Sequence, residues 1–158
     1  MGTRSDIIVH RKDGKWARIY CHWDGYLDHN GQLLFDCYNS QKLAEKLVLE
    51  GDMSSLSKKC NKPKGHSYDH KVEGYTVYYG RDRGEEDVAA RIFESLAEAW
   101  PSKDTWTEFT YVWDDGQWWV GDADEGGQSL IEVKAALKGK KKIHPHIKAF
   151  GMIFGRHA

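Results

Sequence analysis

The fold is decided by the stretch from Ile7 to His22, which reads IIVHRKDGKWARIYCH. Two segments rich in β-branched and aromatic residues, Ile7–His10 and Trp16–His22, flank an Asp-Gly pair, a strong short-range signal for a hairpin. Side chains along the second segment alternate between two faces. The more apolar set is expected to face the core and consists of Ala17, Ile19, Cys21 and Trp23. The chain is therefore predicted to begin with an antiparallel hairpin.

A second hairpin is predicted further along the chain. Thr105–Trp113 and Gln117–Gly121 flank an Asp-Asp-Gly turn, and apolar and polar residues alternate along both segments. Tyr75–Tyr79 has the composition of another strand, because it is rich in Tyr, Thr and Val. The polar residues 52–71 are predicted to form a long loop.

Helices are predicted between these hairpins and after them. Ser40 is a good N-cap for a helix over Gln41–Glu50, and Gly51 is placed to end it. Gln32–Tyr38 can form one short helix. Residues 129–138 begin with a capping-box sequence that predicts another helix. Val88–Trp100 is ambiguous, although its Ala and Glu content favours a helix.

The fold class predicted from these elements is α+β: antiparallel hairpins form a sheet, and two to four helices pack on it. The chain has 158 residues, which fits a single domain. The net charge is only −1, but it is unevenly distributed. Residues 138–158 hold six of the 23 Lys and Arg residues and none of the 24 acids. We therefore expect an α+β domain over residues 1–139 and a basic C-terminal tail over residues 140–158.

The sequence indicates reduced thiols and predicts no metal or cofactor. The three cysteines are an odd number, and the first residues do not resemble a signal peptide, which favours the cytoplasm. Cys60, His66 and His70 share one segment, but the Cys-x-x-Cys pairs typical of zinc sites are absent. No apolar run approaches the ~18 residues that a membrane span requires.

The densest group of candidate binding residues follows the first hairpin. His22, Trp23, Asp24, Tyr26 and Asn30 fall at a predicted strand end and in the next loop. Aromatic faces can stack on a nucleobase or another planar ligand, while Asp and Asn fix its hydrogen-bonding edge. The alternative is that the two aromatic residues fill the core and the polar residues form ordinary turns.

A second group of candidate residues lies in a charged turn between two glycines. Arg81 and Arg83 could hold a phosphate group between their guanidinium groups, and Asp82 lies between them. The alternative is an internal network of Arg and carboxylate groups that pins the loop. We predict that loops 22–31 and 80–85 meet and form one concave binding site.

Signatures of catalysis are sparse in this sequence. It contains no GxSxG, P-loop, GxGxxG or HExxH motif, so no catalytic residue is assigned. The alternative is a small enzyme acting on nucleotides or nucleic acid, with His22, Asp24 and Asp82 as acid–base candidates. A third alternative is an inhibitor whose acidic body imitates a phosphate backbone in a nucleic-acid-binding complex.

Several short motifs are distinctive when taken together. They are TRS at 3–5, IYCHWDGY at 19–26, NG at 30–31, YN at 38–39, GDMSSL at 51–56 and YGRDRGE at 79–85. With them the chain resembles a family of small accessory proteins encoded by bacteriophages and prophages. The likeness covers residues 3–87 and, more weakly, the second hairpin. It implies a protein that acts on the host or its defences in the bacterial cytoplasm.

From this resemblance we expect a non-enzymatic counter-defence factor. Its partner would be a nucleotide-like host signal or a host defence protein, bound through the two candidate loops. A homo-oligomer remains an open alternative, and no membrane contact is expected.

Overall fold

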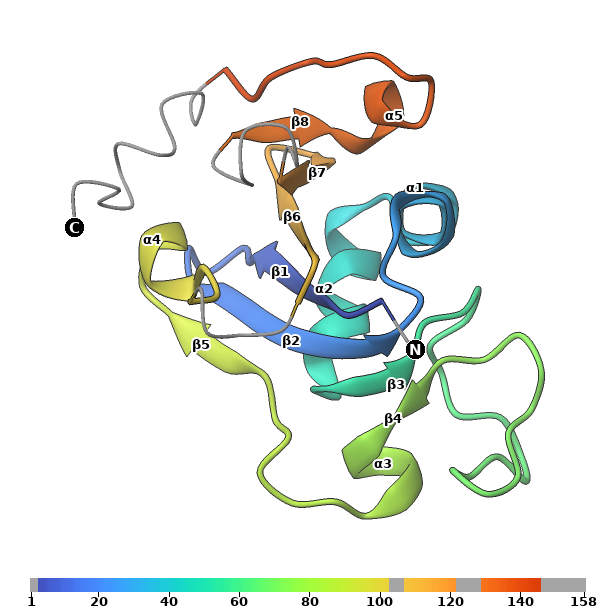
Figure 1. Cartoon of the computed structure of the whole chain (residues 1–158). Helices are drawn as coiled ribbons and strands as arrows, with labels where there is room; N and C mark the ends of the chain where they lie inside the picture. The colour runs from blue at the N-terminus through green and yellow to red at the C-terminus, as the bar shows by residue number, and fades with distance from the viewer. Residues whose placement is uncertain (1–2, 103–106, 122–128, 146–158) are drawn as a thin grey trace.

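The computed structural model describes residues 3–102, 107–121 and 129–145 of the chain. Its strands are β1 (Ser5–His10), β2 (Trp16–Trp23), β3 (Met53–Ser55), β4 (Val77–Tyr78), β5 (Arg91–Phe93), β6 (Phe109–Asp114), β7 (Gln117–Gly121) and β8 (Leu130–Glu132). They form one sheet of eight strands in the order β4-β3-β2-β1-β6-β7-β8, with β5 paired to β2 (Figure 1). The α+β class is confirmed for the described residues.

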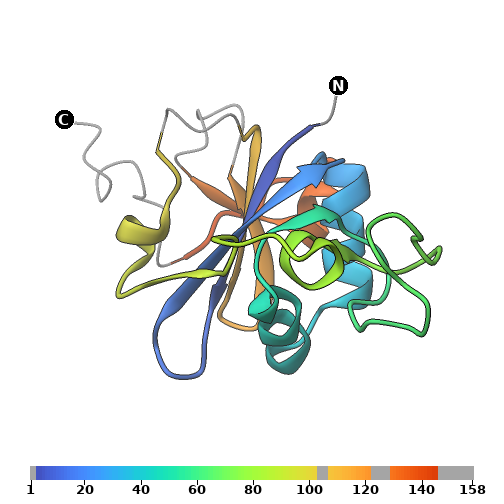
Figure 2. The ribbon, with the colours of Figure 1, turned by 90° about the horizontal axis from the view of Figure 1, so that it is seen from below.

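The helices lie on both faces of this sheet. They are α1 (Gln32–Cys37), α2 (Gln41–Leu49), α3 (Tyr79–Arg83), α4 (Leu96–Ala99) and α5 (Val133–Ala136), and a π-helical turn over Leu27–Gly31 precedes α1. Figure 2 shows α1 and α2 on one side of the sheet and α4 on the other. The described residues therefore contain five α-helices, more than the two to four that were predicted.

Both predicted hairpin turns are confirmed. Gly14 has φ +87°, and the Gly14 N–H donates to the Arg11 carbonyl at 3.0 Å. Asp115 and Gly116 have φ values of +52° and +73°, the left-handed pair that a tight turn between β6 and β7 requires. The part of the second hairpin at residues 105–106 lies outside the described residues.

The sheet is mixed and not built from antiparallel hairpins alone. β1 pairs with β6 in parallel, and β2 pairs with β3 in parallel, because both edges of the first hairpin accept strands from later in the chain. β3 lies inside residues 52–71, so the prediction of one continuous loop there is wrong. The strand predicted over Tyr75–Tyr79 shortens to β4, since Tyr79 begins α3.

Capping residues predicted a helix correctly only where the same residues do not pair as a strand. The Ser40 Oγ accepts from the Leu43 N–H at 3.2 Å, and Gly51 adopts φ +83°, as predicted for α2. The helix predicted over residues 129–138 is largely wrong, because β8 pairs with β7 and leaves only α5 helical. The ambiguous segment Val88–Trp100 contains β5 and α4, with Ser95 as the N-cap of α4.

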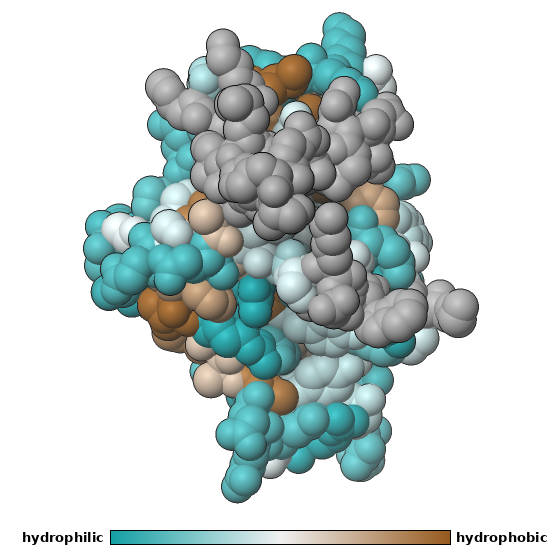
Figure 3. All heavy atoms as spheres, turned by 60° about the vertical axis from the view of Figure 1, so that its left-hand side comes forward, coloured by the Kyte–Doolittle hydropathy of each residue, from teal (hydrophilic) through white to brown (hydrophobic). Residues whose placement is uncertain are grey.

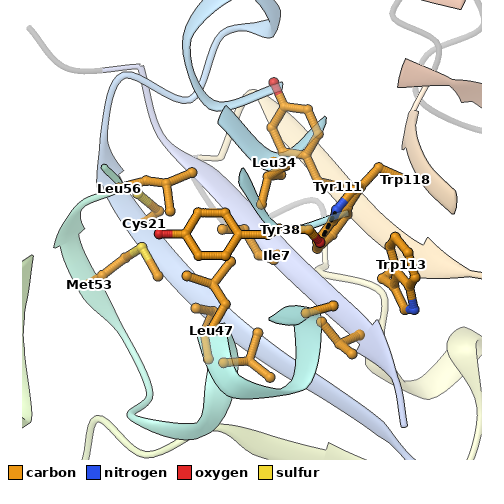
Figure 4. Close-up of a cluster of buried hydrophobic side chains, with 14 of the residues drawn as sticks. Ile7, Cys21, Leu34, Tyr38, Leu47, Met53, Leu56, Tyr111, Trp113 and Trp118 are labelled. Atoms are coloured by element: carbon orange, nitrogen blue, oxygen red, sulfur yellow. Dashed lines mark hydrogen bonds between the residues drawn. The ribbon is translucent and has the colours of Figure 1, made fainter. Parts of the chain in front are cut away.

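The larger core lies under α1 and α2. As predicted, Ala17, Ile19 and Cys21 face it. Tyr38 lies in the middle of the cluster drawn in Figure 4, where its carbonyl accepts from the Trp118 Nε1–H at 3.0 Å. The hydroxyl group of Tyr38 donates to the Ser57 carbonyl at 2.5 Å. Burying such large rings with their polar atoms paired is what allows this small domain to use so many aromatic residues.

A second, smaller core lies on the opposite face of the sheet. Its members come from β1, β2, β6, β7, β8 and α4, and they are Ile8, Trp16, Leu96, Ala99, Val112, Trp119 and Leu130. Because both faces are packed there, β1 is buried on both sides. This explains why the middle of β1, Ile7–Val9, is apolar without alternation.

The segment after α5 is attached to the edge of the sheet. The His144 N–H donates to the Leu130 carbonyl at 2.9 Å, and Ile143 pairs with Ile131. The Asp114 carboxylate accepts from His144 Nε2 at 2.9 Å and from His10 Nδ1 at 2.8 Å. The beginning of the expected basic tail is therefore part of the folded domain, while residues 146–158 lie outside the described residues. Among the described helices none is both long and apolar enough to cross a membrane.

Candidate functional site

The loop that follows β2 presents two large aromatic side chains to solvent. Trp23 is 41% exposed and Tyr26 is 40% exposed. The prediction that Trp23 faces the core with Ala17, Ile19 and Cys21 is wrong, because β2 ends at Trp23. The alternative in which both aromatic residues fill the core is wrong as well.

The loop is held closely against the start of β1. The Gly25 N–H donates to the Thr3 carbonyl at 2.6 Å, and the Tyr111 hydroxyl donates to the Gly25 carbonyl at 2.6 Å. A Cβ atom on Gly25 would lie only 2.7 Å from the Ser5 Cβ, closer than packed atoms can approach. Glycine is therefore required at this point of the loop.

Asn30 completes the attachment of the loop from inside the protein. Its side chain is 0% exposed, and its Nδ2 donates to the Ser5 Oγ at 3.2 Å. Its Oδ1 accepts from His29 Nδ1 at 2.9 Å, and the same nitrogen lies 3.1 Å from the Asp24 carbonyl. Two oxygen partners require that His29 Nδ1 carries the proton. Asn30 therefore anchors the loop and is not available to a ligand.

His22 lies on the other face of the sheet from Cys21 and contacts Trp23. Its Nδ1 is 2.7 Å from the Tyr20 hydroxyl, and its ring meets the Trp23 ring edge-on at 4.7 Å. Burial raises the pKa of Tyr20, so this hydroxyl keeps its proton and can donate to the imidazole. The ring pair fixes one side of Trp23.

Arg81 and Asp82 form an internal network. The Arg81 Nε donates to the Asp82 Oδ1 at 2.8 Å, and its Nη1 donates to the Cys60 carbonyl at 2.7 Å. The Asp82 Oδ2 accepts from the Tyr78 N–H at 2.8 Å and lies 3.3 Å from His66 Nε2. Burial alone would raise the pKa of Asp82, but the hydrogen bonds from Arg81 and Tyr78 lower it overall. These groups pin loop 57–75 to α3.

Arg83 is the more accessible of the two arginines. Its guanidinium contacts two neighbouring rings, 4.5 Å from the centre of Tyr68 and 4.8 Å from the centre of Tyr79. It also pairs with Glu85. This arrangement stabilises the turn after α3 through cation–π contacts.

The structure does not bring the two candidate loops together. β3 runs parallel to β2, with Met53 beside Cys21. β4 runs antiparallel to β3, with Tyr78 opposite Met53, so β4 is also antiparallel to β2. α3 therefore continues away from the end of β2, and the Tyr79 N–H donates to the Asp52 carbonyl at 3.1 Å. In Figure 1 α3 lies at the bottom, while α1, which follows the aromatic loop, lies at the upper right. The predicted joint pocket, and the acid–base set of His22, Asp24 and Asp82, are not assembled.

A polar patch on the sheet was missed by the sequence analysis. Asp6 is 5% exposed, lies opposite Tyr20 in the β1–β2 pair, and accepts from the Thr107 Oγ1 at 2.8 Å. Burial raises the pKa of Asp6, although the Thr107 hydrogen bond and the Arg18 charge act against this. The strand alternation that puts Asp6 on the face of Arg18 and Tyr20 was the available signal.

Asp52 extends this patch across the edge of β2. β5 pairs with the first half of that edge and β3 with the second half, which leaves the Tyr20 N–H between them without a strand partner. The Asp52 Oδ1 accepts from this N–H at 2.8 Å. The Arg91 Nη1 donates to the same oxygen at 2.7 Å. Figure 3 views the molecule from the side of α4, where the coloured surface is mostly hydrophilic with small separate apolar patches.

No protein-family model matches the chain, and comparisons with curated proteins and with solved structures found no match. A functional assignment therefore depends on the chemistry of the residues described above.

We expect Arg81→Ala to act on stability, since it leaves the buried Asp82 carboxylate without its guanidinium partner. Breaking a buried ion pair costs about 3–5 kcal/mol. Thermal unfolding should show a large loss for Arg81→Ala and a clearly smaller one for Arg83→Ala, because Arg83 and its partner Glu85 are both partly exposed. Equal melting temperatures for the two variants would contradict the structural role of Arg81.

The raised pKa of Asp6 predicts that its charge destabilises the fold at neutral pH. The folded state disfavours the ionised carboxylate, so ionisation of Asp6 costs folding free energy at every pH above the folded-state pKa. This cost disappears below about pH 3.8, where Asp6 is protonated in the folded and in the unfolded protein. Asp6→Asn should raise the melting temperature at pH 7, and the difference from the parent should close as the pH falls toward 3.8. The exposed Asp36→Asn should change stability by less than about 0.5 kcal/mol. An unchanged or lowered melting temperature for Asp6→Asn at pH 7 would contradict this account.

Proposed function

We propose that this chain is a phage-encoded accessory protein that binds a host defence protein through Trp23 and Tyr26 and performs no catalysis. The phage context comes from the sequence resemblance. The binding mode is supported by one observation: two large aromatic side chains are 41% and 40% exposed on a loop whose backbone is held by internal hydrogen bonds.

The attachment of the loop is what makes these aromatic residues suitable for binding. Gly25 and Asn30 connect the loop to Thr3 and Ser5, so little conformational freedom remains to be lost when a partner binds. Aromatic anchors of this kind dominate protein interfaces, where the most important ones contribute about 2 kcal/mol or more.

A protein partner fits this surface better than a nucleotide-like signal. Two of the polar side chains that the sequence offered for reading a small ligand, Asn30 and Arg81, are engaged within the protein. What the loop exposes are aromatic faces, with His22 against one side of Trp23. Such a surface matches an apolar pocket on another protein.

The test is expression of the chain in bacteria whose defence system blocks a phage. The parent chain should restore plaque formation, and Trp23→Ala and Tyr26→Ala should each weaken binding of the defence protein by about 30-fold, the equivalent of 2 kcal/mol. Plating efficiency and affinity for the purified defence protein are the two measurements.

Leu49→Ala is the matched control, because Leu49 is an apolar side chain on α2 that is even more exposed than Trp23. It should restore plaque formation as well as the parent chain does. The proposal fails if Trp23→Ala restores plating as fully as Leu49→Ala at equal expression and melting temperature. It also fails if the parent chain restores plating in none of the defended hosts tested.

A further inference from the structure

A cavity of about 350 Å³ lies on a part of the molecule that the candidate loops do not use. It is bounded by the end of α1, the β6–β7 turn, the end of β8, and the segment that follows α5. Figure 1 shows α5 above α1 at this side of the molecule. The volume is at the lower end of the range for small-molecule sites, about 300–1,000 Å³.

The most unusual group in the cavity wall is the carboxylate of Glu132. Its side chain is only 8% exposed, and its partner among the described residues is Lys142, whose Nζ lies 3.4 Å from Oε2. That lysine is itself 66% exposed, so it neutralises the carboxylate without enclosing it. A buried carboxylate normally accepts several hydrogen bonds. Glu132 therefore has acceptor capacity directed at the cavity.

Positive charge surrounds the mouth of the cavity. Lys134 and Lys142 line it, and Lys134 has no hydrogen bond or ion pair within the described residues. Three further lysines on the same short segment are exposed: Lys138, Lys140 and Lys141. The segment is fixed in place, because the Glu132 N–H donates to the Lys142 carbonyl at 2.8 Å. An anionic group is therefore attracted to this rim.

The remaining walls combine apolar surface with amide groups. Trp118 and Phe35 supply the apolar part, and the Trp118 indole is held by its hydrogen bond to the Tyr38 carbonyl. Asn39 and Gln117 also line the cavity, and neither side chain has a hydrogen-bond partner in the described part of the chain. These amides can both donate and accept.

We propose that this cavity binds a nucleoside monophosphate, with the phosphate on Lys134 and the base directed at Glu132, which keeps Lys142 as its ion-pair partner. The ligand must carry an anion for Lys134 and N–H donors for the carboxylate, separated by an apolar body. Guanine fits Glu132 best, since it presents two adjacent N–H donors that one carboxylate can accept together, whereas uracil presents one. The amides of Asn39 and Gln117 take the remaining polar atoms of the base or the ribose.

Calorimetric titration of the full chain with GMP tests this proposal. GMP should bind at one molecule per chain, with guanosine, inorganic phosphate and UMP each binding at least about tenfold more weakly, because each lacks part of the recognised group. Lys134→Ala should weaken GMP binding by about tenfold or more, the usual loss for a charge-assisted hydrogen bond. Lys138→Ala is the matched control and should leave the affinity unchanged, because Lys138 is exposed on the same segment and does not line the cavity.

Glu132→Gln separates recognition of the base from attraction of the anion. The amide is nearly isosteric with the carboxylate, so the variant should retain its melting temperature and lose the preference for GMP over UMP. The proposal is overturned if GMP shows no saturable binding up to about 1 mM, or if Lys134→Ala and Lys138→Ala weaken it equally. Trp23→Ala should leave GMP binding intact, so a failure here is distinct from a failure of the proposed docking surface.

Discussion

The close contact between the loop after β2 and the start of β1 is the constraint on which the candidate surface depends. Gly25 lies so near Ser5 that a single methyl group would prevent the contact, and Asn30 bonds to the same serine from inside the core. β1 in turn is hydrogen-bonded on both edges and packed on both faces. The position of Trp23 and Tyr26 is therefore set by a strand that is paired on both edges and buried on both faces.

Polar side chains that bond within the protein stabilise the fold, whereas those with unused hydrogen-bonding capacity can bind a ligand. Arg81, Asp82 and Asn30 have the chemistry of a binding site, but their hydrogen bonds are made within the protein. By contrast, the Glu132 carboxylate can accept further hydrogen bonds, and the Lys134 ammonium has no ion-pair partner among the described residues. The two surfaces that we assign to binding thus differ in chemistry: one is aromatic and suits a protein, and the other is polar and suits a small anion.

The sequence predicted those parts of the fold that local chemistry determines. The turns at Gly14 and Gly116 and the capped helix α2 follow from residues a few positions apart. β3 has three residues and little β-propensity, and it exists because β2 offers a free edge, which sequence periodicity does not reveal. The capping signal before residue 133 failed for a similar reason, since pairing with β7 outweighs it. The cavity was not predicted because its walls come from segments about 100 residues apart, which only the tertiary structure brings together.

Native-state hydrogen exchange of the Gly25 and Asn30 amides tests most directly whether the aromatic loop is preformed. Both amides are hydrogen-bonded, Gly25 to the Thr3 carbonyl and Asn30 to the Tyr26 carbonyl. The account predicts that they exchange as slowly as amides of β1, through openings close to global unfolding in free energy. Exchange near the rate of an unprotected amide, while β1 stays protected, would show that the loop opens independently and would contradict the account.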